Sequence, residues 1–509
     1  MIKPETIFWD TCAIREFDTK LIPWFTEFLG TDIDSDTKGK FQKYLSALRD
    51  DLVLVAEHPY TDKVFRDSYY HFHAAKYRSI PRNCMRVFLF EQDVSFSKSP
   101  LLADQEALQK AFLGYFVLRP LPSHPFGRAM ISPKAFKQKD FVCCLSVSTC
   151  GFFGHKLHVA AYPHESQDSE THSCAETAIW TIFEYYGNLY SEHRPVLPTD
   201  ITRTLQAGSP RRLLPSKGLS VIEIARALQN LGHDTQTFSR GAGKMSDQDF
   251  FRYLHYLIES GIPVVLSLEL ANSQTGSKDG HAVIAMGHTL KTNAQCPDPA
   301  KTQDEIRLFD SADICCDLVS IDDNKPPYTV LCPKNPGTAY GESYRSDSKI
   351  LQFIVPLHRH MYMDVIGASK LIHNILLHPQ IGIPRFTRKI DIFYRILLTG
   401  SRSFKHWLLQ DPGFSPTLKE IVIGTAMPRF VWICELSRPK DYAAGKANGF
   451  MVIDATGPVS ESSLLLNLFA GKITLFTADG TSEYYSCGTF SFGQYKNNLK
   501  GAWSNWSLK

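Results

Sequence analysis

The chain has 509 residues, a formal net charge of +3 and 43% hydrophobic residues. It is too long for a single hydrophobic core, so we expect two to four domains. The nearly neutral charge does not indicate a nucleic-acid partner or an anionic membrane. No apolar run approaches the length of a membrane span, and the first residues lack a signal-peptide pattern. We therefore expect a cytoplasmic protein with no nucleic-acid or membrane partner.

The 12 cysteines are scattered and contain no CxxC pair. Two vicinal pairs, Cys143-Cys144 and Cys315-Cys316, lie in apolar runs that have the composition of strands. Cysteines of this kind are usually free thiols in a reducing compartment. The pattern therefore favours buried free thiols over a disulfide framework.

Residues 1–150 are expected to form a mixed α/β domain of unknown role. Leu52–Glu57 and Met85–Glu91 have the composition of strands. No catalytic constellation stands out in this region. Arg119 and Arg128 lie beside a Pro-rich turn, where we favour structural salt bridges over an anion site.

The second expected domain, residues 151–358, contains a helix that begins at Cys174. Apolar residues recur there at offsets of three and four, and Ser173 or Asp168 is the expected cap. Cys174 would lie in the first turn, where unpaired N–H groups and the helix dipole favour a thiolate. The apolar stripe consists of Ala175, Ala178, Ile179, Ile182, Phe183 and Tyr186.

A histidine and an aspartate follow at the ends of two predicted strands. Gly280-His281 opens an apolar strand, which would place the imidazole at the rim of a sheet. The next strand, Ile306–Asp310, ends in a carboxylate that we expect to orient His281, with Asp313 as the nearest rival. Gln167, in the loop before Cys174, is the expected side-chain donor to an oxyanion.

Residues 158–315 resemble the C39-like branch of the papain-like cysteine peptidases. The resemblance rests on the order of several features: Tyr-Pro, a Gln, a Cys helix ending in Tyr-Tyr-Gly, the run Gly218–Gly232, a Gly-His strand and a strand ending in Asp. It implies a papain-like fold with a helical lobe and a sheet lobe. By resemblance, the nucleophile is Cys174, the base His281, the orienter Asp310 and the oxyanion donor Gln167. Ala175 departs from the pattern, because members often have Gly after the nucleophile.

Residues 359–509 are expected to form a third domain, helical at first and then rich in strands. Met363–Leu377 has amphipathic helical spacing, and Phe430–Leu436 and Gly449–Ala455 have the composition of strands. The Pro- and Gly-rich segment Asn324–Ser348 is expected to be a mobile loop that could cover the cleft. The predicted fold class is thus α+β, with a papain-like two-lobed domain flanked by two other regions.

The expected function is a cysteine peptidase that hydrolyses peptide or isopeptide bonds in a protein or peptide substrate through a Cys-His-Asp triad. By analogy, its setting would be bacterial regulation, processing or defence. Three alternatives remain open: a catalytically inactive papain-like scaffold, a transglutaminase-type acyltransferase, and a nucleotide-dependent protein that uses Gly241–Lys244. A nucleotide site at Gly241–Lys244 is disfavoured because Met245 stands where Ser or Thr should bind magnesium. We expect no cofactor.

We also expect no metal ion. Four histidines and Cys174 are close in sequence, but their spacing fits no compact zinc pattern. These histidines are His155, His158, His164 and His172.

Overall fold

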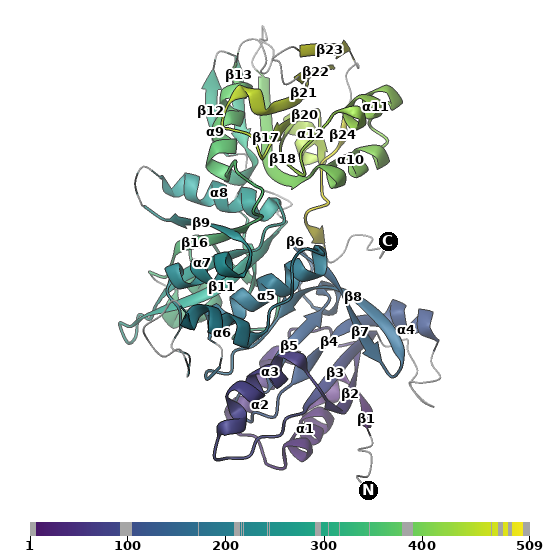
Figure 1. Ribbon diagram of the computed structural model, residues 1–509, viewed down its shortest axis with the longest axis vertical. Helices are drawn as coiled ribbons and strands as arrows, with labels where there is room; N and C mark the ends of the chain where they lie inside the picture. The colour runs from purple at the N-terminus through teal and green to yellow at the C-terminus, as the bar shows by residue number, and fades with distance from the viewer. Residues whose placement is uncertain are drawn as a thin grey trace.

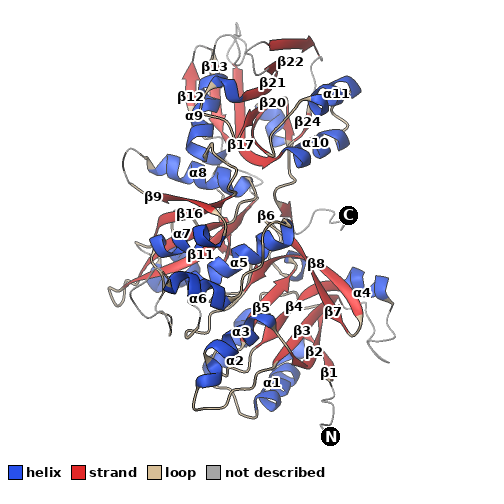
Figure 2. Cartoon of the chain, viewed as in Figure 1, coloured by secondary structure: helices blue, strands red, loops and turns tan. Residues whose placement is uncertain are grey.

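The computed structural model of the chain has three large sheets, stacked from the N-terminal to the C-terminal part with helices against each (Figure 1). The architecture is mixed α+β, as the sequence predicts, and nearly all strand pairs are antiparallel (Figure 2). None of the described helices is long and apolar enough to cross a lipid bilayer. The structure describes residues 7–91, 104–171, 173–207, 214, 216, 218–241, 243, 245–290, 297–303, 305–314, 316–345, 347–378, 390–469, 471–476, 482–486 and 491–501.

The N-terminal sheet is antiparallel, in the order β1-β2-β3-β4-β5-β8-β7. Side chains of β3 alternate between two cores, with Val87 and Leu89 in one and Phe88 and Phe90 in the other. The strands are β1 (Phe8–Ala13), β2 (Leu52–Tyr60), β3 (Cys84–Glu91), β4 (Phe112–Leu118), β5 (Phe126–Ile131), β7 (Ser146–Phe152) and β8 (His155–His164). The helices are α1 (Ile22–Leu29), α2 (Ser35–Leu45), α3 (Lys63–His71) and α4 (Gln105–Ala111).

The boundary expected at residue 150 falls inside β7. Strand β8, expected to lead the second domain, instead pairs with β7 and β5 in the N-terminal sheet. A two-residue turn joins β7 to β8, with positive φ at Phe153 (44°) and Gly154 (92°). Turns of this kind favour an antiparallel hairpin, which explains why β8 stays with β7. The N-terminal sheet therefore extends to His164.

The central sheet is antiparallel, in the order β15-β14-β11-β10-β16-β9, and β6 and β25 extend it beside the end of β11. Helix α5 contacts both β11 and the N-terminal strands β7 and β8. The strands are β6 (Phe141–Cys143), β9 (Asp234–Ser239), β10 (Val264–Ala271), β11 (Lys278–Thr289), β14 (Leu318–Ile321), β15 (Thr329–Leu331), β16 (Lys349–Leu357) and β25 (Lys500–Gly501). The helices are α5 (Cys174–Leu189), α6 (Pro198–Gln206), α7 (Val221–Leu231) and α8 (Asp247–Glu259).

The C-terminal sheet has the order β12-β13-β17-β18-β20-β21-β22-β23, and its β13–β17 pair is parallel. The strands are β12 (Lys301–Gln303), β13 (Ile306–Asp310), β17 (Ile390–Gly400), β18 (Phe430–Ser437), β20 (Gly449–Asp454), β21 (Leu464–Phe469), β22 (Lys472–Phe476) and β23 (Ser482–Ser486). A separate small pair consists of β19 (Lys446–Ala447) and β24 (Phe492–Gly493). The helices are α9 (Val365–Leu376), α10 (Ser401–Gln410), α11 (Pro416–Gly424) and α12 (Pro439–Ala443).

Strand β13 does not lie in the sheet that its place in the sequence suggested. It was expected next to the His281 strand, but it lies in the C-terminal sheet, paired with β17 (Figure 1). The chain thus leaves the central sheet after β11, forms β12 and β13, and returns to pair β14 with β11. Residues 151–358 therefore contribute strands to all three large sheets.

Candidate active site

Cys174 is the first residue of α5, as predicted, and its side chain is partly exposed. The helix forms because its apolar stripe is buried against both neighbouring sheets. Ser173 is the N-cap, and its backbone N–H donates to Oε2 of Glu176 at 3.1 Å. The cap fixes the start of the helix, so the Cys174 thiol lies where helix N–H groups lack intrahelical acceptors.

His281 lies on β11, and the structure brings it together with Cys174. The Cys174 side chain is near enough to the imidazole to help raise the pKa of His281. The next residue, Ala282, donates its backbone N–H to Cys174 Sγ at 3.4 Å. Both groups lie next to the sulfur.

Asp322, and not Asp310, is the carboxylate that contacts His281. Its Oδ1 lies 3.1 Å from His281 Nε2. Asp322 directly follows β14, whose last residue, Ile321, pairs with Ile284 on β11. Because Nε2 is bound to Asp322, Nδ1 is the ring nitrogen left to face Cys174.

Two residues of the segment after β14 hold the other oxygen of Asp322. Tyr340 donates its hydroxyl to Oδ2 at 2.7 Å, and Lys325 Nζ lies 3.7 Å from the same oxygen. Lys325 Nζ also sits 3.3 Å above the Tyr340 ring and donates to the carbonyl of Ala339 at 2.6 Å. The segment expected to be a loop that could cover the cleft therefore contributes Lys325 and Tyr340 to the site.

His281 and Asp322 each stabilise the charged form of the other. Burial alone would lower the pKa of His281, but the hydrogen bond to Asp322, the neighbouring Cys174 and the charge of Asp322 raise it to about 10. Burial also acts to raise the pKa of Asp322, yet His281, Lys325 and Tyr340 hold it well below its usual range. The centre therefore holds an imidazolium between the Cys174 sulfur and an ionised carboxylate at neutral pH.

Asp310, the predicted orienter, lies elsewhere. It is fully buried between the α8 helix and the C-terminal sheet, and its Oδ2 accepts hydrogen bonds from Tyr256 and from Tyr394, the latter at 2.9 Å. Burial raises the pKa of Asp310 to about 6. Its rival, Asp313, is bound by Arg252 at 2.7 Å and does not contact His281 either. Asp310 ends β13 and Asp313 follows it closely, so both lie beside the C-terminal sheet and away from the central sheet.

Gln167, the predicted oxyanion donor, lies beside the segment that carries Asp322. Its Nε2 donates to Oδ1 of Asn324 at 2.6 Å, and its carbonyl accepts from Arg119 at 3.1 Å. No hydrogen bond joins Gln167 to Cys174 among the described residues. The structure therefore places Gln167 at the edge of the site, where Asn324 orients its side chain.

A small cavity of about 10 Å³ lies beside Cys174 and is walled by two acidic side chains, Glu165 and Asp323. Arg119 donates to Glu165 at 3.1 Å, and both side chains are almost completely buried. Burial and the neighbouring charge of Asp322 raise the pKa of Asp323. The salt-bridge interpretation is confirmed for Arg119, and also for Arg128, which binds Asp62 at 3.0 Å.

The site also has the donor set of a metal centre. One ligand atom each from His281, Asp322 and Asp323 lie within 4.8 Å of one another. The Lys325 ammonium and the Tyr340 hydroxyl already approach Asp322, however, and they stabilise its negative charge without a metal ion. The geometry favours an ion-paired thiol centre.

Other candidates from the sequence lie outside this constellation. His158 contacts Thr149 at 2.9 Å, and His164 donates through Nε2 to the carbonyls of Asp322 and Lys325, each at 3.1 Å. His164 therefore supports the turn that carries Asp322. His172 and part of the Gly241–Lys244 segment lie outside the described residues.

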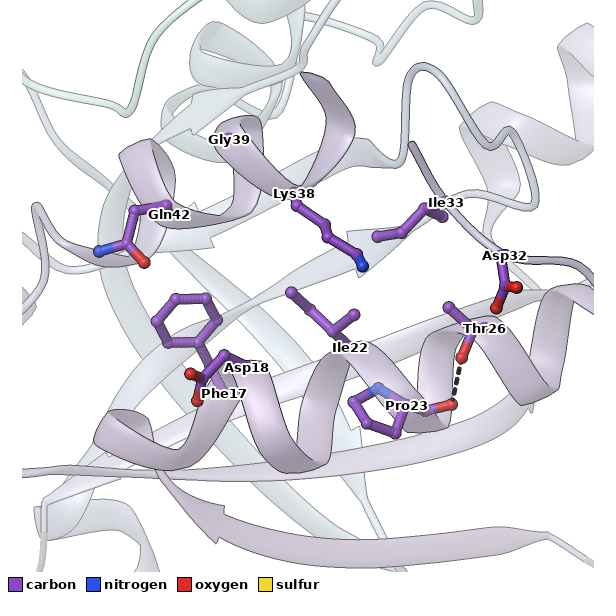
Figure 3. Close-up of a pocket in the computed structure, with 10 residues that line it drawn as sticks. All are labelled: Phe17, Asp18, Ile22, Pro23, Thr26, Asp32, Ile33, Lys38, Gly39 and Gln42. Atoms are coloured by element: carbon purple, nitrogen blue, oxygen red, sulfur yellow. Dashed lines mark hydrogen bonds between the residues drawn. The ribbon is translucent and has the colours of Figure 1, made fainter. Parts of the chain in front are cut away.

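A cavity of about 600 Å³ opens between α1 and α2, and none of its lining residues belongs to the candidate site (Figure 3). Its wall mixes apolar side chains such as Ile22 and Ile33 with Asp18, Asp32 and Lys38. No family model matches the chain, and a search of curated proteins returns no significant match. A functional assignment therefore depends on the residues and geometry around Cys174.

Proposed function

We propose that the protein is a cysteine peptidase with a papain-like central region and a Cys174–His281–Asp322 triad. The observation that carries the proposal is the continuous arrangement of thiol, imidazole and carboxylate, with Asp322 3.1 Å from His281 Nε2. A helical element supplies the nucleophile and an antiparallel sheet supplies the base, as in the C39-like resemblance. The proposed triad thus keeps the Cys174 and His281 of that resemblance and has Asp322 in place of Asp310.

The chemistry follows from the positions of the atoms. The Cys174 sulfur attacks the carbonyl carbon of a peptide or isopeptide bond, and an oxyanion forms. His281 Nδ1 donates its proton to the departing amine, which leaves an acyl-enzyme. Water then attacks the acyl carbon and gives a proton to His281, the bond to the Cys174 sulfur breaks, and the carboxylic acid product leaves the thiolate behind. Asp322 holds Nε2–H throughout and stabilises the imidazolium without accepting its proton.

The oxyanion needs hydrogen-bond donors that are already in place. The Cys174 backbone N–H belongs to the first turn of α5, where it has no intrahelical acceptor. Gln167 is the proposed second donor, because its amide has one N–H beyond the one given to Asn324. A Gln167→Ala exchange would then lower turnover more than it lowers reactivity of the thiol.

One observation favours the inactive scaffold as a second candidate. The cavity at Cys174 is about 10 Å³, roughly the space of one water molecule, which is too small for a substrate side chain. An extended peptide lying across the surface needs no such pocket. The two functions differ in whether a bond is broken, so turnover separates them.

The test is a search for new peptide termini. The full chain is incubated with a mixture of proteome-derived peptides, beside a Cys174→Ala variant, and new N-termini are identified by mass spectrometry. Termini produced by the wild type alone support the peptidase. The same experiment with an added primary amine detects acyl transfer, because amide products would replace the free acids. Identical peptide sets from both chains, together with an unreactive Cys174, would favour the catalytically inactive scaffold instead.

A further inference from the structure

The turn after α5 and the residue after β16 bring one glutamate and two histidines together, away from the Cys174 centre. One ligand atom each from Glu192, His193 and His358 lie within 4.8 Å of one another. Glu192 and His193 belong to the turn that follows α5, in which the His193 N–H donates to the Tyr190 carbonyl at 3.1 Å. His358 directly follows β16. These three residues are called the Glu192 cluster below.

The spacing of the Glu192 cluster is close to that of a metal centre. The ligand atoms around a tetrahedral zinc ion lie about 3.3 Å apart, because each bond to nitrogen or oxygen is about 2.0–2.1 Å long. Glu192 Oε1 lies 3.5 Å from His358 Nε2, which is longer than an ordinary hydrogen bond. The centroids of the His193 and His358 rings are 5.9 Å apart, and the rings are inclined by 80°. Small side-chain rotations would therefore place all three ligand atoms around one ion.

A cavity of about 70 Å³ adjoins the cluster, and His193 and His358 line it together with His233. His233 is 1% exposed, and neither of its ring nitrogens has a hydrogen-bond partner among the described residues, although the Leu357 backbone lies near the ring. Buried polar groups are rarely left without a partner, and a bound ion or water molecule is one explanation. A water molecule on a metal ion in this cavity would give His233 such a partner.

The protonation states of the cluster suit a metal ion. Burial lowers the pKa of His193 and of His358, so both imidazoles are neutral near pH 7. A neutral imidazole nitrogen binds a metal ion, whereas an imidazolium does not. Glu192 is ionised, because its own backbone N–H and the Arg429 guanidinium lower its pKa to about 2. The cluster thus offers two neutral nitrogens and one carboxylate.

Two existing contacts must yield to the ion. The Arg429 guanidinium contacts Glu192 Oε1, and the His360 N–H donates to His358 Nδ1 at 3.3 Å. The side chains of Arg429 and Glu192 are 48% and 40% exposed, and an exposed ion pair contributes little to stability. The bond from His360 is long, and it is given up when Nε2 binds the ion and the ring proton moves to Nδ1. In the Cys174 centre, by contrast, the lysine beside the carboxylate is buried.

We propose that Glu192, His193 and His358 bind one Zn²⁺ ion, with a water molecule as the fourth ligand. Two imidazole nitrogens and one carboxylate suit zinc, whereas Mg²⁺ and Ca²⁺ favour oxygen ligands. The ion joins the turn after α5 to the end of β16. No metal ion was expected from the sequence, because His358 comes from a distant segment and no spacing pattern reveals it. The site shares no residue with the Cys174 centre, so it does not depend on peptidase activity.

The test measures zinc binding by the full chain. The protein is titrated with Zn²⁺ in the presence of a chromophoric chelator that competes for the ion, and Mg²⁺ is the control ion. Thiols and the His281 centre could also take up zinc, so the comparison is between variants that differ in one histidine. We expect His358→Phe, which keeps a ring but has no ligand nitrogen, to weaken the binding of one zinc ion by more than about tenfold. His406→Phe is the matched control, because His406 is exposed on α10, and it should bind zinc like the wild type.

A second measurement identifies the donor atoms. Co²⁺ occupies tetrahedral zinc sites, and thiolate ligands then give an intense near-ultraviolet charge-transfer band that nitrogen and oxygen ligands do not give. We expect a tetrahedral Co²⁺ spectrum without this band in the wild type, and its loss in Glu192→Gln. The Glu192 side chain is 40% exposed, so this variant decides if His358→Phe does not fold. No zinc binding by the wild type, or equal binding by the wild type and the folded variants of the cluster, would overturn the proposal.

Discussion

His281 Nε2 and Asp322 Oδ1 lie 3.1 Å apart, although the two residues are 41 positions apart in the chain. Between them the chain visits the C-terminal sheet, forms β12 and β13, and returns as β14. The partner of the base is thus supplied by the strand that pairs with β11 in space and not by the next strand in sequence.

Replacing Asp322 by Asn should slow alkylation of Cys174. A neutral amide stabilises the His281 imidazolium less than a carboxylate does, so the thiolate is less favoured. We expect labelling by limiting iodoacetamide at about pH 6.5 to fall by roughly tenfold. Asp310→Asn is the matched control, because this buried aspartate contacts Tyr256 and Tyr394 instead. A larger loss in the Asp310 variant would restore the original assignment.

Asp310 should affect the stability of the folded protein and not the reactivity of Cys174. Burial raises its pKa to about 6, so the native state binds the proton more tightly than the unfolded chain does. The free energy of unfolding should therefore decrease as pH rises from about 4 to about 6, and this contribution should then level off. Asp310→Asn removes the titrating group. Urea unfolding from pH 4 to pH 7 should show a smaller decline for the variant, and parallel curves would contradict the assignment.

Tyr340→Phe removes the hydroxyl that donates to Asp322 Oδ2 at 2.7 Å. The expected loss is about 1 kcal/mol in the free energy of unfolding, the usual net value of one hydrogen bond. Thiol reactivity should fall less than in the Asp322→Asn variant, because the bond between His281 and Asp322 remains. Tyr362→Phe is the control, since that tyrosine is 71% exposed. An unchanged Tyr340 variant in both assays would remove Tyr340 from the site.

How much of this site the sequence predicts depends on which contacts are local. The helical stripe, its Ser173 cap and the strand of His281 are local patterns, and the structure shows all three. The sheet to which β13 belongs is set by its parallel pairing with β17, a long-range contact that leaves no local pattern. The strand Leu318–Ile321 is short and hard to predict. The two aspartates that directly follow it, Asp322 and Asp323, were the available sign of a carboxylate partner for His281.

Tyr340 was missed for a related reason. It comes from a Pro- and Gly-rich segment, and such composition predicts a loop without showing what the loop contacts. In the structure the segment contains β15 and two short 3₁₀ helices, Pro336–Tyr340 and Glu342–Tyr344. Lys325 and Tyr340 then converge on Asp322 because the segment folds back over β14. Only tertiary packing brings them together.

Arg119→Met should destabilise the protein strongly. The guanidinium is 2% exposed and donates to the buried Glu165, so its loss leaves a carboxylate buried without its cation. Breaking such a pair costs about 3–5 kcal/mol. The exposed pair of Arg345 and Glu342 provides the control, and Arg345→Ala should change the free energy of unfolding by less than about 1 kcal/mol. Chemical denaturation at about pH 7 measures both, and equal effects would contradict the prediction.

The activation of Cys174 by His281 is tested most directly by the pH dependence of Cys174 alkylation. The rate is measured from pH 5 to pH 8 in the wild type and in His281→Ala. The raised pKa of His281, about 10, keeps the imidazolium across this range, so the wild-type rate should stay high and vary little with pH. Without the imidazole the rate at low pH should collapse and then rise with pH as for an ordinary thiol. A wild-type rate that rises in the same way as the variant's would contradict an activated thiolate at Cys174.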